Sequence, residues 1–177
     1  MSTLEVNTIN PQSGSTITLG SSGNTVALGS GATAGFGKIG QVVSTDWVGE
    51  QSTSSSSFVD ITNSSLSITP SSTSSKILVT FHINGIRKDG VNGYGSFQLV
   101  GSGGSSLSKK VGHAVLYTDS ALKLRIGSQS GTFLDSPATT SLCTYKLQMV
   151  SLATGIQITV GDNGDTRSSI TLMEVLA

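Results

Sequence analysis

Charged side chains are scarce in this sequence. Asp, Glu, Lys and Arg make up 11% of the 177 residues, and ten basic residues balance ten acidic ones. A chain whose formal net charge is zero offers no electrostatic attraction to the phosphates of nucleic acid or to an anionic membrane surface. We therefore expect neither of these partners, and we expect solubility to come from the abundant Ser, Thr, Asn and Gly.

Cysteine and long apolar runs are also nearly absent. Cys143 is the single cysteine, which excludes an intrachain disulfide, and its alternating surroundings "CTYKLQMV" predict a buried thiol. No segment approaches the roughly 18 consecutive apolar residues of a membrane-spanning helix. The opening "MSTLEVNTINPQ" has neither the basic nor the apolar region of a secretory signal. We expect a protein that is made in the cytoplasm and is not inserted into a membrane.

The sequence also lacks the 3.6-residue apolar period of amphipathic helices. Apolar residues alternate with polar ones instead, a period typical of strands that bury one face. We predict strands at 57–62, 65–69, 76–84, 95–100, 121–127, 144–150, 156–160 and 168–176. Asn163 and Gly164 predict a hairpin turn between the last two strands, and the alternation in 76–84 places His82 on a solvent-facing or interface side. The predicted fold class is all-β, with two packed sheets such as a jelly roll.

The composition changes near Gly35–Gly37. Before this point apolar residues come in isolated pairs among Ser, Thr and Gly, and after it the predicted strands are longer and carry aromatic residues. We therefore divide the chain into an N-terminal stem, residues 1–37, and a jelly-roll-like β-sandwich head, residues 38–177. In the head, Trp47 either anchors a contact between subunits or packs in the core.

A short pattern occurs twice in the stem, as "TITLG" at 16–20 and "TVALG" at 25–29. The apolar residues of each copy share one strand face. Burying these side chains contributes roughly 1.5–3 kcal/mol each, which does not offset a backbone ordering cost of roughly 1–2 kcal/mol per residue. Either the segment is a flexible Gly/Ser linker, or several chains pool their apolar faces. We favour a thin β-stem intertwined in a trimer, with an interior of Ile17, Leu19, Val26 and Leu28.

Five quoted stretches carry a resemblance to a known group of proteins. The opening "MSTLEVNTINPQSGSTITLGSSGNTVALGSGAT", "GKIGQVVSTD", "SFVDIT…LSITPSSTSSKILV", "LDSPATTS…TYKLQMV" and the terminal "SSITLMEVLA" are similar to tail-fibre-like virion proteins of marine and cyanobacterial tailed phages. The resemblance implies a β-rich homotrimer on the particle surface that attaches to another virion protein through residues 1–37. Phages of this kind also carry trimeric capsid decoration (cement) proteins, so placement on the tail and on the shell both stay open.

No arrangement of catalytic or metal-binding residues stands out. His82 and His113 lie too far apart in sequence for a recognisable metal site, and Asp162 and Asp165 lack the ligand number of a calcium loop, which favours a solvated turn. The ten acidic residues are scattered rather than paired as a glycan-cleaving groove requires. We expect no cofactor, no metal and no enzymatic activity, and a glycan-degrading tailspike is the least favoured function.

Residues suited to ligand binding are easier to find in the sequence than catalytic or metal-binding ones. The stretch "IRKDGVNGYG" brings Arg87, Lys88, Asp89 and Tyr94 into one predicted Gly-rich loop, and Tyr117 ends another. Loops on a rigid sandwich commonly carry binding residues, and a tyrosine can stack on a sugar ring while charged neighbours bond to its hydroxyls. We predict a receptor-binding loop for a host-surface glycan at these five residues, with an ordinary solvated loop as the alternative.

Overall fold

The computed structural model describes residue 9 and residues 39–103, 108–112, 124–162 and 164–176. The predicted stem interior (Ile17, Leu19, Val26 and Leu28) and Tyr117 lie outside these residues. The strands are β1 (Ile39–Trp47), β2 (Gln51–Thr53), β3 (Val59–Asp60), β4 (Leu66–Ile68), β5 (Lys76–Gly90), β6 (Gly95–Ser102), β7 (Ser108–Gly112), β8 (Leu124–Asp135), β9 (Cys143–Ser151), β10 (Ile156–Val160) and β11 (Ser168–Val175). Within the described ranges there is no helix with the length and hydropathy needed to cross a membrane.

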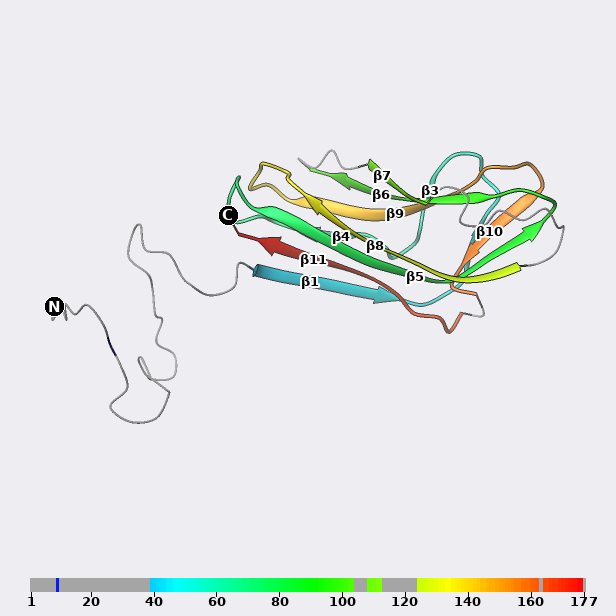
Figure 1. Cartoon of the computed structure of the whole chain (residues 1–177), viewed down its shortest axis with the longest axis horizontal. Coiled ribbons are helices and arrows are strands. Elements are labelled where there is room, and N and C mark those ends of the chain that lie inside the picture. Colours follow the sequence, from blue (N-terminus) through cyan, green and yellow to red (C-terminus); the bar gives the residue numbers. More distant parts are fainter. Residues whose placement is uncertain (1–8, 10–38, 104–107, 113–123, 163, 177) are drawn as a thin grey trace. The chain divides into compact units, whose positions relative to one another are not determined.

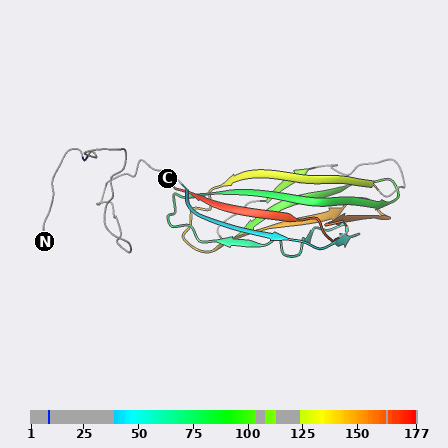
Figure 2. The same cartoon turned by 90° about the horizontal axis from the view of Figure 1, so that it is seen from below.

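The first sheet, sheet A, is built on the long strand β5. β8 pairs with one side of β5 along most of its length. The other side of β5 is shared, because β11 pairs with its first half and β10 with its second half. β1 lies beyond β11 and β2 lies beyond β10, and every pairing is antiparallel. Figure 2 shows β8, β5, β11 and β1 side by side.

The pairing corrects the hairpin predicted at Asn163 and Gly164. Both β10 and β11 are antiparallel to β5, so they run in the same direction as two segments of one interrupted row (Figure 1). The Gly164 amide donates to the carbonyl of Gly161 over 2.8 Å, so the turn signal produces a local turn rather than a strand reversal. A strand of 15 residues is long enough to pair with both segments one after the other.

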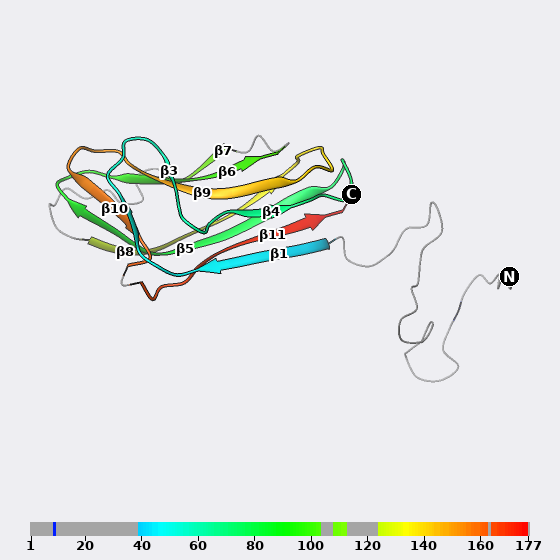
Figure 3. The same ribbon diagram turned by 180° about the vertical axis from the view of Figure 1, so that it is seen from behind.

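The second sheet, sheet B, is centred on β9. β3 and β4 pair with one side of β9, β6 pairs with the other, and β7 pairs with β6. Sheets A and B pack face to face as two layers (Figures 1 and 3). The described residues therefore form a sandwich of two antiparallel sheets, and the predicted all-β class is confirmed.

The core lies between the two sheets and follows the period of two in the sequence. From Ile77 to Ile83, β5 buries every second residue, and Phe81 of this strand stacks on Phe133 of β8 with ring centroids 6.4 Å apart. Trp47, 7% exposed, packs in the core rather than at the surface, and the predicted burial of Cys143 is confirmed. The fully buried members of the core include Ile77, Val79, Ile83, Phe97, Leu99, Tyr145, Leu147, Met149, Ile158, Ile170 and Leu172.

One carboxylate lies inside this apolar layer, near the end where β1 begins. Glu174 of β11 is 1% exposed and lies on the inner face with Leu172. Its Oε1 accepts hydrogen bonds from the Ser71 amide and hydroxyl, each 2.6 Å long, and its Oε2 accepts one of 2.7 Å from Gln41. These hydrogen bonds stabilise the negative charge of the Glu174 carboxylate, which burial alone would strongly disfavour.

Candidate functional site

Arg87, in the second half of β5, is bonded to three carboxylates. Its guanidinium bonds to Asp89 (Nε–Oδ2, 2.8 Å), to Glu50 (Nη2–Oε1, 3.2 Å) and to Asp162 through Nη1. The Arg87 side chain is only 8% exposed. We call these four residues the Arg87 cluster. It lies at the end of sheet A where β5 ends and β10 begins.

Separate segments supply the three carboxylates. Asp89 shares a strand face with Arg87, Glu50 precedes β2, and Asp162 lies in the segment 161–167 that connects β10 to β11. This segment is fixed to β5, because the Gly161 and Asp162 amides each donate to β5 carbonyls, at Asn84 and Gly85, over 3.0 Å. The cluster therefore joins a strand to two connections that are distant in sequence.

The close approach depends on Gly85. Its φ is +62°, in the left-handed region, and a Cβ there would lie 2.5 Å from the Asp162 amide nitrogen. We expect Gly85→Ala to destabilise the fold by about 1–3 kcal/mol, through backbone strain and displacement of the 161–167 segment. Urea unfolding measures this loss. Gly164→Ala is the matched control, because its φ is similar (+74°) but its Cβ would meet no atom within 4 Å. Equal losses in both variants would contradict the role of the close approach.

The three acidic side chains of the cluster differ in how far they are exposed to solvent. The Asp162 side chain is 6% exposed, that of Asp89 25% and that of Glu50 40%. The hydrogen bond to Asp89, supported by those to Glu50 and Asp162, outweighs burial and raises the pKa of Arg87 above its ordinary value. Arg87 is therefore a permanent buried cation that fixes two partly exposed carboxylates.

A cleft of about 200 Å³ adjoins the cluster, and Glu50 belongs to both. Its wall combines apolar side chains with partners for hydrogen bonds: Trp47, Val48, Gly49, Glu50, Gln51, Ile61, Thr62, Asn63 and Val160. The volume is below the range of about 300–1,000 Å³ found for small-molecule pockets. The cleft thus suits one ring or side group of a larger ligand.

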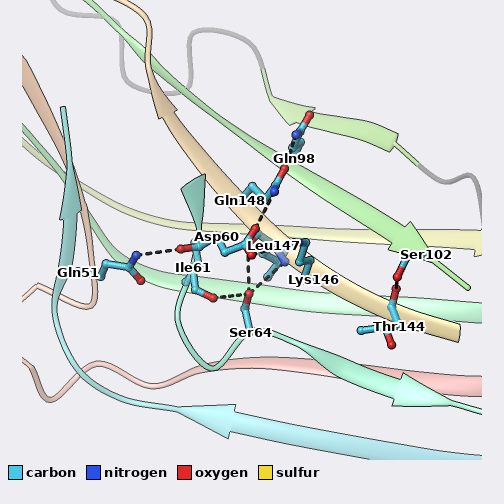
Figure 4. A network of polar contacts seen from close by, with 10 residues as sticks. All are labelled: Gln51, Asp60, Ile61, Ser64, Gln98, Ser102, Thr144, Lys146, Leu147 and Gln148. Atoms are coloured by element: carbon cyan, nitrogen blue, oxygen red, sulfur yellow. Dashed lines mark hydrogen bonds and ion pairs between the residues drawn. The ribbon is translucent and has the colours of Figure 1, made fainter. Parts of the chain in front are cut away.

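Side-chain hydrogen bonds connect residues of the cleft to the neighbouring strands (Figure 4). The Gln51 amide donates to the Asp60 carbonyl over 2.9 Å and accepts from the Thr62 amide over 2.6 Å. The Asp60 carboxylate in turn accepts from Lys146 over 2.8 Å and from Gln148 over 2.6 Å. These bonds tie β2, the segment 60–62 and β9 together, so the cleft is formed before a ligand arrives.

The chemistry of the cleft favours hydroxyl-rich ligands. Glu50 supplies carboxylate oxygens that accept hydrogen bonds from hydroxyls, and exposed Asn63 supplies an amide that both donates and accepts. Val48, 48% exposed, adds an apolar contact. Within the described part of the chain, no group of three or more His, Cys, Asp and Glu side chains is placed to hold a metal ion.

The structure corrects the predicted placement of the binding residues. Arg87, Lys88 and Asp89 belong to strand β5 and not to a loop. Arg87 is 7% exposed and Lys88 is fully buried, so neither side chain is open to a ligand as the loop prediction requires. Strand pairing with β10 continues through all three residues, and pairing with β8 continues to Lys88, because carboxylates from other segments compensate Arg87. Asp89 and Tyr94 keep partial exposure.

Glu50 is not among the residues that the sequence singles out, and the sequence predicts Asp162 as part of a solvated turn. Asp162 is 4% exposed and pairs with Arg87. The signal available in the sequence was a basic residue inside a strand-forming run, since such a residue needs an acidic partner when it is buried. The pattern does not identify that partner, because Glu50 and Asp162 lie 37 and 75 residues from Arg87.

The described fold belongs to the all-β class of two-sheet sandwiches. No protein-family model and no curated protein matches the sequence. Among solved structures, a structure of infectious bursal disease virus, Gx strain, gives a TM-score of 0.38 and 8% identity over 86% of this chain and 46% of that chain. A mutant VP2 protein of the same virus, in derived T=1 particles, gives 0.36 and 7% identity over 87% of this chain and 41% of that chain. The chain spans less than half the length of these viral proteins, and a likeness of this degree assigns neither a family nor a function.

Proposed function

We propose that the protein is a structural component of a phage virion: a homotrimeric tail-fibre component that is assembled in the host cytoplasm and exposed on the particle. Residues 1–37 form its intertwined stem and attach it to another virion protein. The jelly-roll-like sandwich is presented for binding to a host-surface glycan. The resemblance of the sequence to tail-fibre-like proteins supports this proposal.

One observation carries the proposal more than any other. The first strand of the sandwich begins at Ile39, which pairs with Val175 at one end of sheet A, whereas the Arg87 cluster and its cleft lie at the other end. The chain therefore enters the sandwich at one end, and the rigid polar cleft lies at the other end. This arrangement is expected of a binding domain that is attached to a particle by its first strand.

The cleft supports binding rather than catalysis in this proposal. A glycan-cleaving enzyme needs one carboxylic acid and one carboxylate free to exchange protons across an open groove. The acidic residues of the Arg87 cluster are instead held by one permanent cation. The alternative function, a capsid decoration protein that stabilises the shell as a trimer, differs in placement on the particle rather than in the properties of the sandwich.

The host-binding part of the proposal predicts the effect of two cleft substitutions. We expect the double variant Glu50→Ala/Asn63→Ala to bind isolated host-surface polysaccharide about tenfold more weakly, a loss of about 1.4 kcal/mol, because hydrogen-bonding groups leave the cleft while its apolar wall remains. Fluorescence titration of the full chain measures the affinity. Gln98→Ala, on the outer face of sheet B, should bind like the parent protein. Unchanged affinity of the double variant would contradict the cleft as the binding site.

A further inference from the structure

The outer face of sheet A carries an exposed apolar row. Residues directly opposite each other in neighbouring antiparallel strands share a face. Val42 pairs with Met173, Met173 with Leu78, and Leu78 with Leu134, so the row crosses β1, β11, β5 and β8 (Figure 2). Val42 is 55% exposed and Leu134 is 53% exposed.

A second apolar pair extends the row toward the start of β1. Ile39, 47% exposed, lies opposite Val175. We call the six residues the apolar band: Ile39, Val42, Leu78, Leu134, Met173 and Val175. Contiguous exposed apolar surface of this kind commonly marks a contact with another molecule.

The outer face of sheet B shows what a water-facing surface looks like in the same molecule. The corresponding row there consists of Asp60, Gln148 and Gln98, which are opposite each other across β3, β9 and β6. Their side chains bond to one another along the row (Figure 4). The two outer faces therefore differ in chemistry, although both belong to half-buried sheets of one sandwich.

The polar rows next to the apolar band favour a second copy of this chain as its partner. Ser44, Thr171, Thr80 and Thr132 form the adjacent row, and each hydroxyl both donates and accepts hydrogen bonds, so the row can bond to uncharged polar groups of a second copy. The next row contains Asp46, which is neutralised by an ion pair with Arg167. Among the described residues around the band, Lys76 adds a charge opposite Val175, and the partly exposed carboxylates of the Arg87 cluster lie at the far end of the sheet. A partner of strong charge would therefore find few groups to pair with next to the band.

The position of the apolar band points to the same partner. The sandwich begins at Ile39, within the band, and the 38 preceding residues hold the apolar pairs at 17, 19, 26 and 28 that a single chain cannot bury. Copies joined through that segment would hold their Ile39 residues close together and raise the effective concentration of one band near another.

We propose that the outer face of sheet A, centred on the apolar band, is the contact between the sandwich heads of the homo-oligomer. The inference rests on the proposed trimer and assigns the surface through which its heads meet. Burial of the apolar band removes a contiguous row of exposed apolar side chains from water, and the hydroxyl row fixes the orientation of the copies.

The test measures the accessibility of this face in the full-length protein. Cys143 is buried, so an added cysteine is the reactive one, either in Thr132→Cys on the hydroxyl row or in the control Ser102→Cys on sheet B. We expect maleimide to label the cysteine of Thr132→Cys at least about tenfold more slowly than that of Ser102→Cys, because the contact must open first. Adding Val42→Lys and Leu134→Lys should remove this protection, whereas adding Val91→Lys and Leu142→Lys, which alter similarly exposed residues elsewhere, should keep it.

Two results would overturn the inference. One is equal labelling at the two positions in the parent background. The other is a monomer by light scattering at about 10 μM, well above the dissociation constant of a stable assembly. Location of the protein on the particle is a separate measurement, so a failure of this contact remains distinguishable from a failure of the proposed virion role.

Discussion

Arg87→Met should lower the free energy of unfolding by about 3–5 kcal/mol, the cost of leaving buried charge without its partner. Methionine retains much of the apolar stem of arginine but none of its donors. Asp162, whose side chain is 6% exposed, then lies beside Glu50 and Asp89 without the cation that holds the three together. Urea unfolding of the purified protein at neutral pH measures the change.

Two further variants separate the charge from the packing. Arg87→Met/Asp162→Asn should recover part of the loss, because the amide removes the most deeply buried uncompensated charge. Arg167→Met, which breaks the pair with Asp46 between side chains 68% and 49% exposed, should cost less than about 1 kcal/mol. A loss of similar size at Arg87 and Arg167 would show that the cluster does not stabilise the sandwich.

Acid should destabilise the fold through Glu174. Burial by itself raises the pKa of its carboxyl, but the hydrogen bonds from Ser71 and Gln41 outweigh burial and hold the pKa at about 2, below the ordinary 4.5. A carboxyl whose pKa is lower in the folded chain contributes stability above the unfolded pKa and loses it as the pH falls toward the folded one. At about 1.4 kcal/mol per pKa unit, we expect a loss of about 3 kcal/mol between about pH 5 and pH 2.

Glu174→Gln isolates this contribution from that of the other carboxylates. The variant should be less stable at pH 7 by about 1–3 kcal/mol. The NH2 group of its side-chain amide would face hydrogen-bond donors, where the carboxylate oxygen of Glu174 accepts their hydrogen bonds. Its stability should then fall less steeply below pH 5, so that the two proteins converge near pH 2. Parallel pH profiles from urea unfolding would contradict the assignment of the loss to Glu174.

The sequence predicts strands best where polar and apolar residues alternate regularly. The segment 156–160 coincides with β10, and 168–176 differs from β11 by one residue. The outward placement of His82 is also confirmed, since it is partly exposed and bonds to Ser130 of β8. β1 was not predicted, because its inner face includes Gln41 and Thr45 while Val42 faces outward, which weakens the alternation.

The candidate site was predicted only in part, because the acidic residues that compensate the charge of Arg87 lie far from it in the sequence. The stretch after residue 84 is polar, which favours a loop, yet β5 continues to Gly90. The partners that permit this, Glu50 and Asp162, are fixed by the packing of two sheets rather than by any local pattern. The division into residues 1–37 and 38–177, the stem and the receptor-binding role of Asp89, Tyr94 and Tyr117 stay predictions.

Cryo-electron microscopy of the purified phage particle locates the protein and counts its copies. We expect density for three copies of the two-sheet sandwich on the tail, with the Ile39 ends directed toward the particle and the Arg87 clusters directed outward. Density on the capsid shell would replace the tail-fibre placement with the decoration-protein alternative. Absence of the sandwich from the particle would contradict the claim that the protein is a virion component.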